Sequence, residues 1–153
     1  LHRNLSKVEV KQEVGKLLAK VGIDPRRASE YPHQFSGGMR QRVDIAIALA
    51  CNPTVLIADE PTSALDVTIQ AQILQMMRQL KEENDTSMIL ITHDLAEAIS
   101  TADRVLILSA RPGQVKAEIS LTFAPQYDSP LKRRNAPEFT GYFQNVWRAL
   151  SSR

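Results

Sequence analysis

The stretch VLIADE, residues 55–60, puts four apolar residues directly before two acids. Such a short apolar run predicts a strand buried on both faces, as in a parallel sheet. A strand of this kind brings Asp59 and Glu60 to the C-terminal edge of a sheet, where α/β proteins bind ligands. Because neighbouring strand residues point to opposite faces, one acid can help to hold Mg²⁺ and the other can orient or deprotonate a water. The alternative is a strand that simply ends in surface acids.

The flanking segments alternate between helical and strand patterns, which predicts a parallel α/β sheet. Three prolines and no periodicity between residues 123 and 137 predict an extended linker. The predicted elements are, in chain order, helix 10–21, loop 26–34, helix 39–51, strand 55–58, helix 66–80, strand 88–91, helix 95–102, strand 105–108, strand 114–121 and a last amphipathic helix from residue 139.

The composition is that of a globular protein and argues against several partners. The chain has 153 residues, is 43% hydrophobic and carries a net charge of +2, which is too small to argue for nucleic acid. Its single cysteine excludes an internal disulfide. No apolar run is long enough to span a bilayer, so any role at a membrane is expected to be peripheral. The chain begins with Leu1, and we expect it to be a fragment of a longer protein.

A second candidate site lies in FSGGM, residues 35–39, just before a predicted helix. Glycines let a backbone approach a ligand closely, and a helix start offers N–H groups and a positive dipole end to a phosphate. A plain helix cap is the alternative. His93, directly after the strand 88–91, is a third candidate, because a histidine at that sheet edge can contact a terminal phosphate.

These features occur in an order that resembles the ATPases of ABC transporters. FSGGMRQR, residues 35–42, resembles the ABC signature motif, and residues 55–60 resemble the Walker B strand with its catalytic glutamate. SALD, residues 63–66, is similar to the D-loop, and THD, residues 92–94, to the switch-histidine loop. The resemblance implies an α/β fold of the P-loop NTPase class, namely the C-terminal half of an ABC nucleotide-binding domain with part of its helical subdomain and its parallel sheet.

The resemblance also implies roles for individual residues. The serine and glycines of the signature would bind the γ-phosphate of an ATP held by a second ATPase subunit, Asp59 would support Mg²⁺, and Glu60 would be the general base. Asp66 would couple the two sites, and His93 would contact the γ-phosphate and the attacking water. The residues expected at the nucleotide are Ser36, Gly37, Gly38, Met39, Gln41 and Asp66, with Arg42 bracing the signature helix beside Gln41.

One motif of the family is missing. No G-x-x-x-x-G-K-[ST] occurs, and Gly15-Lys16 lacks the flanking residues that a phosphate-cradling loop needs. We therefore expect the isolated chain to be inactive, and ATP hydrolysis to need the full-length protein. The expected division is a helical subdomain part over 1–52, the ATPase core half over 53–121, and a linker with a C-terminal helix over 122–153. Asp44 and Ile47 depart from the usual signature helix, and Asp44 has no explanation in the sequence.

The resemblance implies a peripheral subunit on the cytoplasmic face of the cell membrane. Its partners would be a second ATPase subunit, transmembrane permease subunits and, indirectly, an extracytoplasmic solute-binding protein. Residues 31–39 and 57–74 resemble peptide and nickel importers, whereas residues 94–99, 102–115 and the tail resemble nitrate, sulfonate and taurine importers, and the tail favours the second group. The alternatives are a soluble ABC ATPase of DNA repair or translation, and a non-catalytic binding module.

Overall fold

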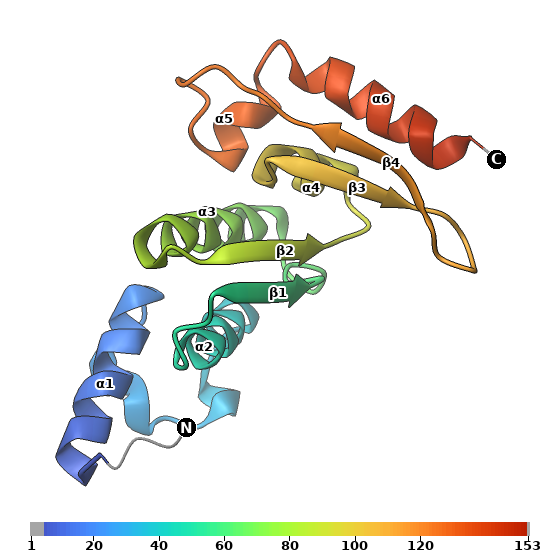
Figure 1. Cartoon of the computed structure of the whole chain (residues 1–153). Coiled ribbons are helices and arrows are strands. Elements are labelled where there is room, and N and C mark those ends of the chain that lie inside the picture. Colours follow the sequence, from blue (N-terminus) through green and yellow to red (C-terminus); the bar gives the residue numbers. More distant parts are fainter. Residues whose placement is uncertain (1–4, 153) are drawn as a thin grey trace. The chain divides into compact units, whose positions relative to one another are not determined.

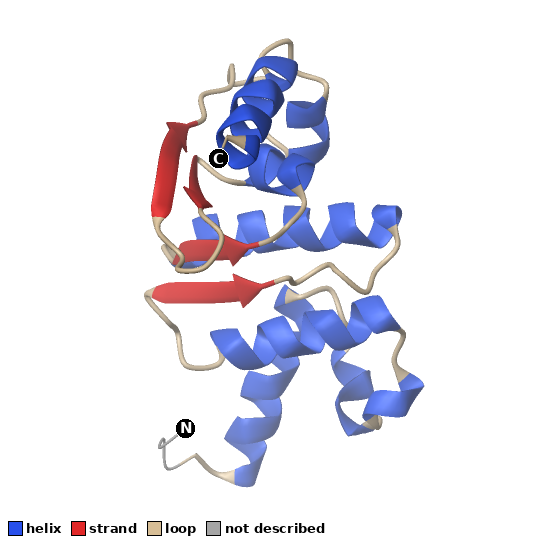
Figure 2. Cartoon of the chain, turned by 90° about the vertical axis from the view of Figure 1, so that its right-hand side faces the viewer, coloured by secondary structure: helices blue, strands red, loops and turns tan. Residues whose placement is uncertain are grey.

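The structure is a computed structural model of the chain and describes residues 5–152. The chain divides into two compact units, residues 1–89 and residues 90–153. Each unit has an apolar core of its own. Helices and strands alternate between residues 55 and 108, as the sequence pattern predicts. Figure 2 shows the helices and the strands in separate colours.

The first unit contains three long helices and two strands that are neighbours in one sheet. Figure 1 shows the two strands side by side and pointing the same way, joined by the helix α3. This confirms the predicted strand–helix–strand arrangement of a parallel sheet. The elements are α1 (Lys7–Lys20), the short 3₁₀ helices η1 (Pro25–Ser29) and η2 (Pro32–Gln34), α2 (Gly37–Leu49), β1 (Val55–Asp59), α3 (Val67–Asn84) and β2 (Ser87–Ile91).

Each long helix of this unit begins at a side chain that accepts a backbone N–H. Ser6 forms a reciprocal capping box with Glu9 at the start of α1. Ser36 caps α2 and Asp66 caps α3. The helix starts predicted at these two positions are therefore confirmed. The segment 26–34, predicted as loop, contains η1 and η2, because Pro25 and Pro32 each suit the first turn of a helix.

The core of the first unit lies between α1, α2 and α3. Ile73 and Val21 are fully buried there, and Ala58 and Met88 bring one side of β1 and β2 against it. The residues that are buried in this core are Leu18, Val21, Ile23, Ile45, Ala46, Leu49, Ile73, Met76, Met77 and Leu80.

The other face of β1 and β2 differs from the sequence prediction. Val55, Ile57 and Ile89 are 50%, 64% and 52% exposed. The prediction of burial on both faces is therefore wrong for the described chain. An all-apolar strand indicates two faces that avoid water, but the described residues pack only one of them.

The second unit combines a β-hairpin with three helices. Its elements are α4 (Leu95–Thr101), β3 (Arg104–Leu108), β4 (Val115–Ser120), α5 (Pro130–Arg134) and α6 (Phe139–Ser151). β3 pairs antiparallel with β4, from Arg104 opposite Ser120 to Leu108 opposite Val115. The turn closes because the Ser109 hydroxyl accepts the Gln114 N–H at 3.0 Å and donates to the Pro112 carbonyl at 2.9 Å. The apolar face of the hairpin shares a core with α4 and α6, in which Ile99 and Val146 are buried.

The segment 123–137 is not the extended linker that its prolines predict. Ser129 caps α5 and Pro130 occupies its first turn, where a proline costs no hydrogen bond. Arg133 is buried in this segment, donates to the Ala102 carbonyl at 2.8 Å, and lies 5.0 Å from the centre of the Phe123 ring. The segment therefore packs onto its own unit, and proline alone does not distinguish a linker from a helix start.

Candidate functional site

The turn at Ser36 presents the start of a long helix to solvent. Ser36 and Gly37 are exposed, and the Ser36 hydroxyl accepts the Met39 N–H at 3.3 Å. The first turn of α2 is therefore ordered by its own cap, while its backbone stays within reach of another molecule. N–H groups and the positive end of the helix dipole meet there, as an anion requires.

The glycines of this turn let α2 pack closely on the start of α3. A β-carbon on Gly38 would lie 2.6 Å from Ile69 Cγ2, which is a severe overlap, whereas one on Gly37 would lie 3.5 Å from Leu65 Cδ2. Gly38 is thus required by packing alone. The two motifs 35–42 and 63–66, which are separate in sequence, come into contact in the first unit through these residues.

A cation–aromatic cluster around Arg27, which the sequence did not predict, contacts residues on both sides of the Ser36 turn. Arg27 pairs with Glu30 at 2.6 Å, lies 4.8 Å from the centre of the Phe35 ring, and donates to Met39 Sδ at 3.3 Å. It also donates to the Gln34 carbonyl. The hydrogen bond from Arg27 lowers the pKa of Glu30. The spacing of Arg27 and Glu30 was the available signal, because oppositely charged residues three apart pair within a helical turn.

The predicted bracing of α2 is found at Arg42. Its guanidinium donates to the Val21 carbonyl at 2.9 Å and to Gln72 Oε1 at 3.4 Å, so it ties α2 to both α1 and α3. Gln41 is half-buried beside it. Asp44 and Ile47 are both exposed on α2, so Asp44 occupies a solvated helix position.

The two acids follow each other at the end of β1. Asp59 is its last residue, and both carboxylate residues are exposed. Glu60 has a φ of 45°, in the left-handed region that costs a residue other than glycine about 1–2 kcal/mol. The Ser63 N–H and hydroxyl both donate to the Glu60 carbonyl, at 3.3 and 3.2 Å. This turn holds the strained backbone in place, and such outliers concentrate at functional sites.

The chemistry of these acids suits magnesium, although no group of three potential metal-binding side chains occurs among residues 5–152. Mg²⁺ prefers oxygen ligands and usually keeps several waters, so one or two carboxylates together with substrate phosphates suffice. Asp59 offers such a carboxylate at an exposed strand end.

Asp66 has a structural task that is visible in the fold. Its carboxylate accepts the Ile69 N–H at 3.0 Å at the start of α3. The preceding turn is fixed by a bond from the Gln70 side chain to the carbonyl of the buried Thr62, at 3.1 Å. Asp66 is exposed, so a second molecule can reach it while it caps α3.

The loop after β2 belongs to the second unit. His93 is exposed between Thr92 and Asp94. The Asp94 carboxylate caps α4 by accepting the N–H groups of Ala96 and Glu97, at 2.8 and 3.0 Å. Ser36, Asp59, Glu60 and Asp66 thus lie in the first unit, whereas His93 lies in the second. The joint action of Glu60 and His93 stays a prediction.

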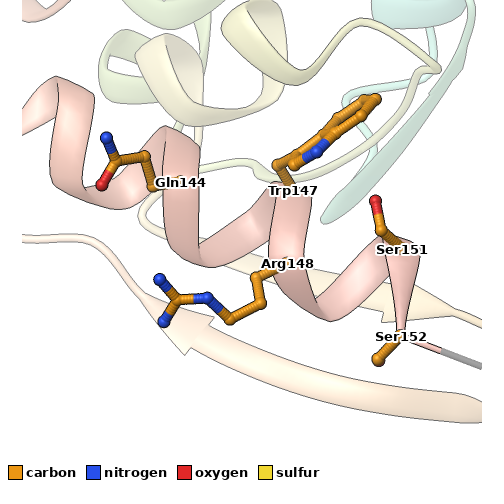
Figure 3. A pocket seen from close by; sticks show the side chains of 5 residues that line it. All are labelled: Gln144, Trp147, Arg148, Ser151 and Ser152. Atoms are coloured by element: carbon orange, nitrogen blue, oxygen red, sulfur yellow. The ribbon is translucent and has the colours of Figure 1, made fainter.

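A shallow hollow elsewhere carries none of the predicted site residues. Figure 3 shows the side chains that line it, and all belong to the last turns of α6 or to its C-cap, namely Gln144, Trp147, Arg148, Ser151 and Ser152. In the part of the chain that the structure describes, no helix is both long and apolar enough to cross a bilayer.

Comparisons with known proteins agree with this geometry. The profile of the ABC transporter family matches residues 1–63. A dipeptide transport ATP-binding protein, DppD of Bacillus subtilis (strain 168), is 50% identical over 129 residues, which are 82% of this chain and 38% of the relative. An oligopeptide transport ATP-binding protein, OppD of the same organism, is 55% identical over 116 residues, covering 74% of this chain and 32% of the relative. This chain spans about a third of the length of these relatives.

A solved structure matches in three dimensions. The ATP-binding cassette MJ0796, in a dimeric post-hydrolysis state bound to ADP and Pi, superposes with a TM-score of 0.66 at 33% sequence identity. The match covers 81% of this chain and 52% of that chain. The fold is therefore that of about half of an ABC-type cassette of the P-loop NTPase class, as predicted. The chain therefore resembles about a third of an ATP-binding protein of the ABC transporter family.

The relatives bear on the two importer groups that the sequence analysis left open. Both are ATP-binding proteins of peptide transport. They favour the peptide resemblance of residues 31–39 and 57–74 over the nitrate, sulfonate and taurine resemblance of the tail. High identity over most of the chain outweighs a few tail residues, because tails tolerate change better than motifs do.

Proposed function

We propose that this chain works as part of an ATP-hydrolysing subunit of an ABC importer, and that the subunit powers peptide uptake. The observation that carries the proposal is Glu60, an exposed carboxylate residue held at a φ of 45° directly after the strand that ends in Asp59. Strain of this kind is retained where a side chain must be aimed. The peptide transport named for the relatives supports the substrate class.

The proposed chemistry is hydrolysis of the terminal phosphate of ATP. Glu60 orients the attacking water and accepts its proton, and His93 contacts the γ-phosphate and that water. Asp59 holds Mg²⁺, which when bound neutralises charge on the phosphate oxygens. Water attacks in line with the leaving ADP.

A second subunit would supply the nucleotide that the Ser36 turn binds. Ser36 offers its hydroxyl, and Gly37 and Gly38 offer backbone N–H donors, to the γ-phosphate of that ATP. Met39 and Gln41 lie close behind on α2. Asp66 would couple the two ATP sites across the dimer interface. The exposure of Ser36, Gly37 and Asp66 supports this role, because a second molecule must reach them.

The wider assembly follows from the transporter class. We propose that the subunit lies on the cytoplasmic face of the membrane, bound to permease subunits that receive solute from an extracytoplasmic binding protein, with no nucleic acid partner. Within the chain, residues 1–52 would belong to the helical subdomain, 53–121 to the ATPase core, and 122–153 to a C-terminal extension. A peptide-loaded binding protein should stimulate turnover by the assembled transporter, and stimulation by a nitrate- or sulfonate-loaded one instead would contradict the peptide assignment.

The test of the chemistry is Glu60→Gln in the complete ATPase subunit. Removal of a general base should lower ATP turnover by about 10²–10⁴-fold while ATP binding persists. Glu118→Gln is the matched control, because Glu118 is an exposed acid on β4 whose bridge to Arg104 is a surface pair. Turnover by Glu60→Gln within a few-fold of the unmutated subunit contradicts the proposal.

The chain by itself should not hydrolyse ATP. Residues 1–153 contain no G-x-x-x-x-G-K-[ST] loop to cradle phosphates. Magnesium-dependent phosphate release from the purified 153-residue chain would show that the division of labour proposed here is wrong.

A further inference from the structure

The second unit holds a buried acid that the proposed chemistry does not use. Glu97, in α4, is only 3% exposed. A carboxylate is costly to bury unless hydrogen bonds replace its water. Because leucine or alanine could be buried at this position at lower cost, we ask what the Glu97 carboxylate contributes.

The Glu97 side chain reaches back to the loop that carries His93. The Thr92 hydroxyl donates to Glu97 Oε2, and the same hydroxyl oxygen accepts the Asp94 N–H at 3.0 Å. Thr92 and Asp94 are the two neighbours of His93. One buried carboxylate therefore fixes the residue before His93 directly and the residue after it through a shared hydroxyl.

The backbone of α4 also binds the loop that carries His93. The Asp94 carboxylate accepts the N–H of Glu97 itself, at 3.0 Å. Three hydrogen bonds therefore form a closed ring: Glu97 carboxylate to Thr92 hydroxyl, Thr92 hydroxyl to Asp94 N–H, and Asp94 carboxylate to Glu97 N–H. His93 lies within this ring and has its side chain exposed.

We propose that Glu97 is a positioning residue for His93: through Thr92 it holds the backbone that aims the imidazole at the terminal phosphate. The inference rests on the proposed ATPase function, because only there does His93 have a phosphate to meet. A histidine on an unbraced loop would sample several positions, and misplacement of a reacting group by about 1 Å can cost 10²-fold in rate.

The test compares variants of the complete ATPase subunit. Glu97→Ala and Thr92→Val each remove the bond and should lower kcat by about tenfold or more with little change in KM for ATP. Glu97→Gln keeps an oxygen that accepts the Thr92 hydroxyl and should stay within about threefold of the unmutated kcat. Both changes break the Thr92–Glu97 bond, and Thr92→Val also removes the acceptor of the Asp94 N–H. The double variant Thr92→Val/Glu97→Ala should therefore be no slower than Thr92→Val alone.

Controls separate positioning from folding. Ser100→Ala removes a buried hydroxyl of the same helix without touching the His93 loop, and should leave kcat unchanged. Should Glu97→Ala fail to fold, Thr92→Val keeps the carboxylate and still tests the bond. The inference is overturned if Thr92→Val keeps kcat within about twofold, or if the two rate losses multiply in the double variant.

A second measurement distinguishes this inference from the function it rests on. In the 153-residue chain, the NMR shifts of the His93 ring and the Asp94 amide should move in Thr92→Val and Glu97→Ala but not in Ser100→Ala. If these shifts do not move, the brace itself is wrong, whatever the activity. If they move but the unmutated subunit has no ATP turnover, the brace exists and the proposed ATPase function fails, and with it the catalytic purpose assigned to Glu97.

Discussion

Gly38 and Ile69 approach so closely that a β-carbon on the glycine would lie 2.6 Å from Ile69 Cγ2. The pair joins the start of α2 to the start of α3, and hence the Ser36 turn to the segment 63–66. The glycine that would serve a phosphate also lets two helices meet. A change at this position therefore moves both motifs together.

Gly38→Ala should destabilise the chain by about 1–3 kcal/mol, the usual cost of overpacking. Helix propensity alone predicts a gain, because alanine is the better helix former, so a loss identifies the clash. Gly141→Ala in α6 is the matched control, since nothing lies within 4 Å of its added carbon. Urea denaturation measures both, and Ile69→Ala should reduce the penalty of Gly38→Ala because it removes the overlapping methyl. Equal effects in both backgrounds would contradict this account.

Glu60→Gly should raise stability and remove activity. Glycine adopts a φ of 45° without strain, so the free energy of unfolding should rise by about 1 kcal/mol, while the complete subunit loses ATP turnover. Asp85→Gly tests the same backbone effect away from the acids, because Asp85 ends α3 at a φ of 50°. Its turnover should stay unchanged. A stability loss in Glu60→Gly would show that the left-handed turn is not strained.

Asp24 should contribute a pH-dependent part of the stability of the first unit. Hydrogen bonds from the Arg26 side chain and backbone lower the pKa of Asp24 from 3.8 to about 2. A carboxyl whose pKa is lower in the folded state stabilises the fold above its unfolded pKa, and this contribution is lost as pH falls from 3.8 towards 2. Asp24→Asn should therefore flatten the fall in stability over that interval in denaturation experiments. A fall in stability over that interval that is as steep in Asp24→Asn as in the unmutated chain would contradict the assignment.

Arg133→Ala should destabilise the second unit by about 2–3 kcal/mol, since it removes a charged hydrogen bond to the Ala102 carbonyl and a contact with the Phe123 ring. Arg133→Lys should recover only part of this, because a lysine lacks the planar group. Lys132→Ala, which breaks an exposed pair with Asp128, should cost less than about 1 kcal/mol. Thermal unfolding followed by circular dichroism compares the three, and equal losses in Arg133→Ala and Lys132→Ala would overturn the prediction.

Much of the fold followed from local patterns. The sequence predicts the helix starts at Ser36 and Asp66, because each depends on a few neighbouring residues. The same holds for the strands that begin near residues 55 and 87. The antiparallel pairing of β3 with β4 departs from the strand–helix rhythm, since the turn over 109–114 is too short for a parallel crossover. The helix α5 was missed because Pro130 stops a helix in the interior of a chain but starts one after a capping serine.

The candidate site divides in the same way. The sequence alone predicts Ser36, Glu60 and His93 as site residues, because each lies in a short contiguous motif and the motifs follow one another in a recognisable order. Glu97 carried no such signal, and Arg27 carried only its three-residue spacing from Glu30. Their importance comes from what they touch, and those contacts form only when the chain folds.

The amino-acid sequence by itself determined the resemblance to a family, the order of the motifs and the residue types proposed to meet a phosphate. Only the tertiary structure decided that Gly38 is needed by Ile69, that Glu60 lies in a left-handed turn, and that a buried carboxylate holds the loop of His93. The reason is physical: residue chemistry and short-range periodicity are local properties of the chain, whereas overlap, backbone strain and burial depend on atoms brought together from distant positions.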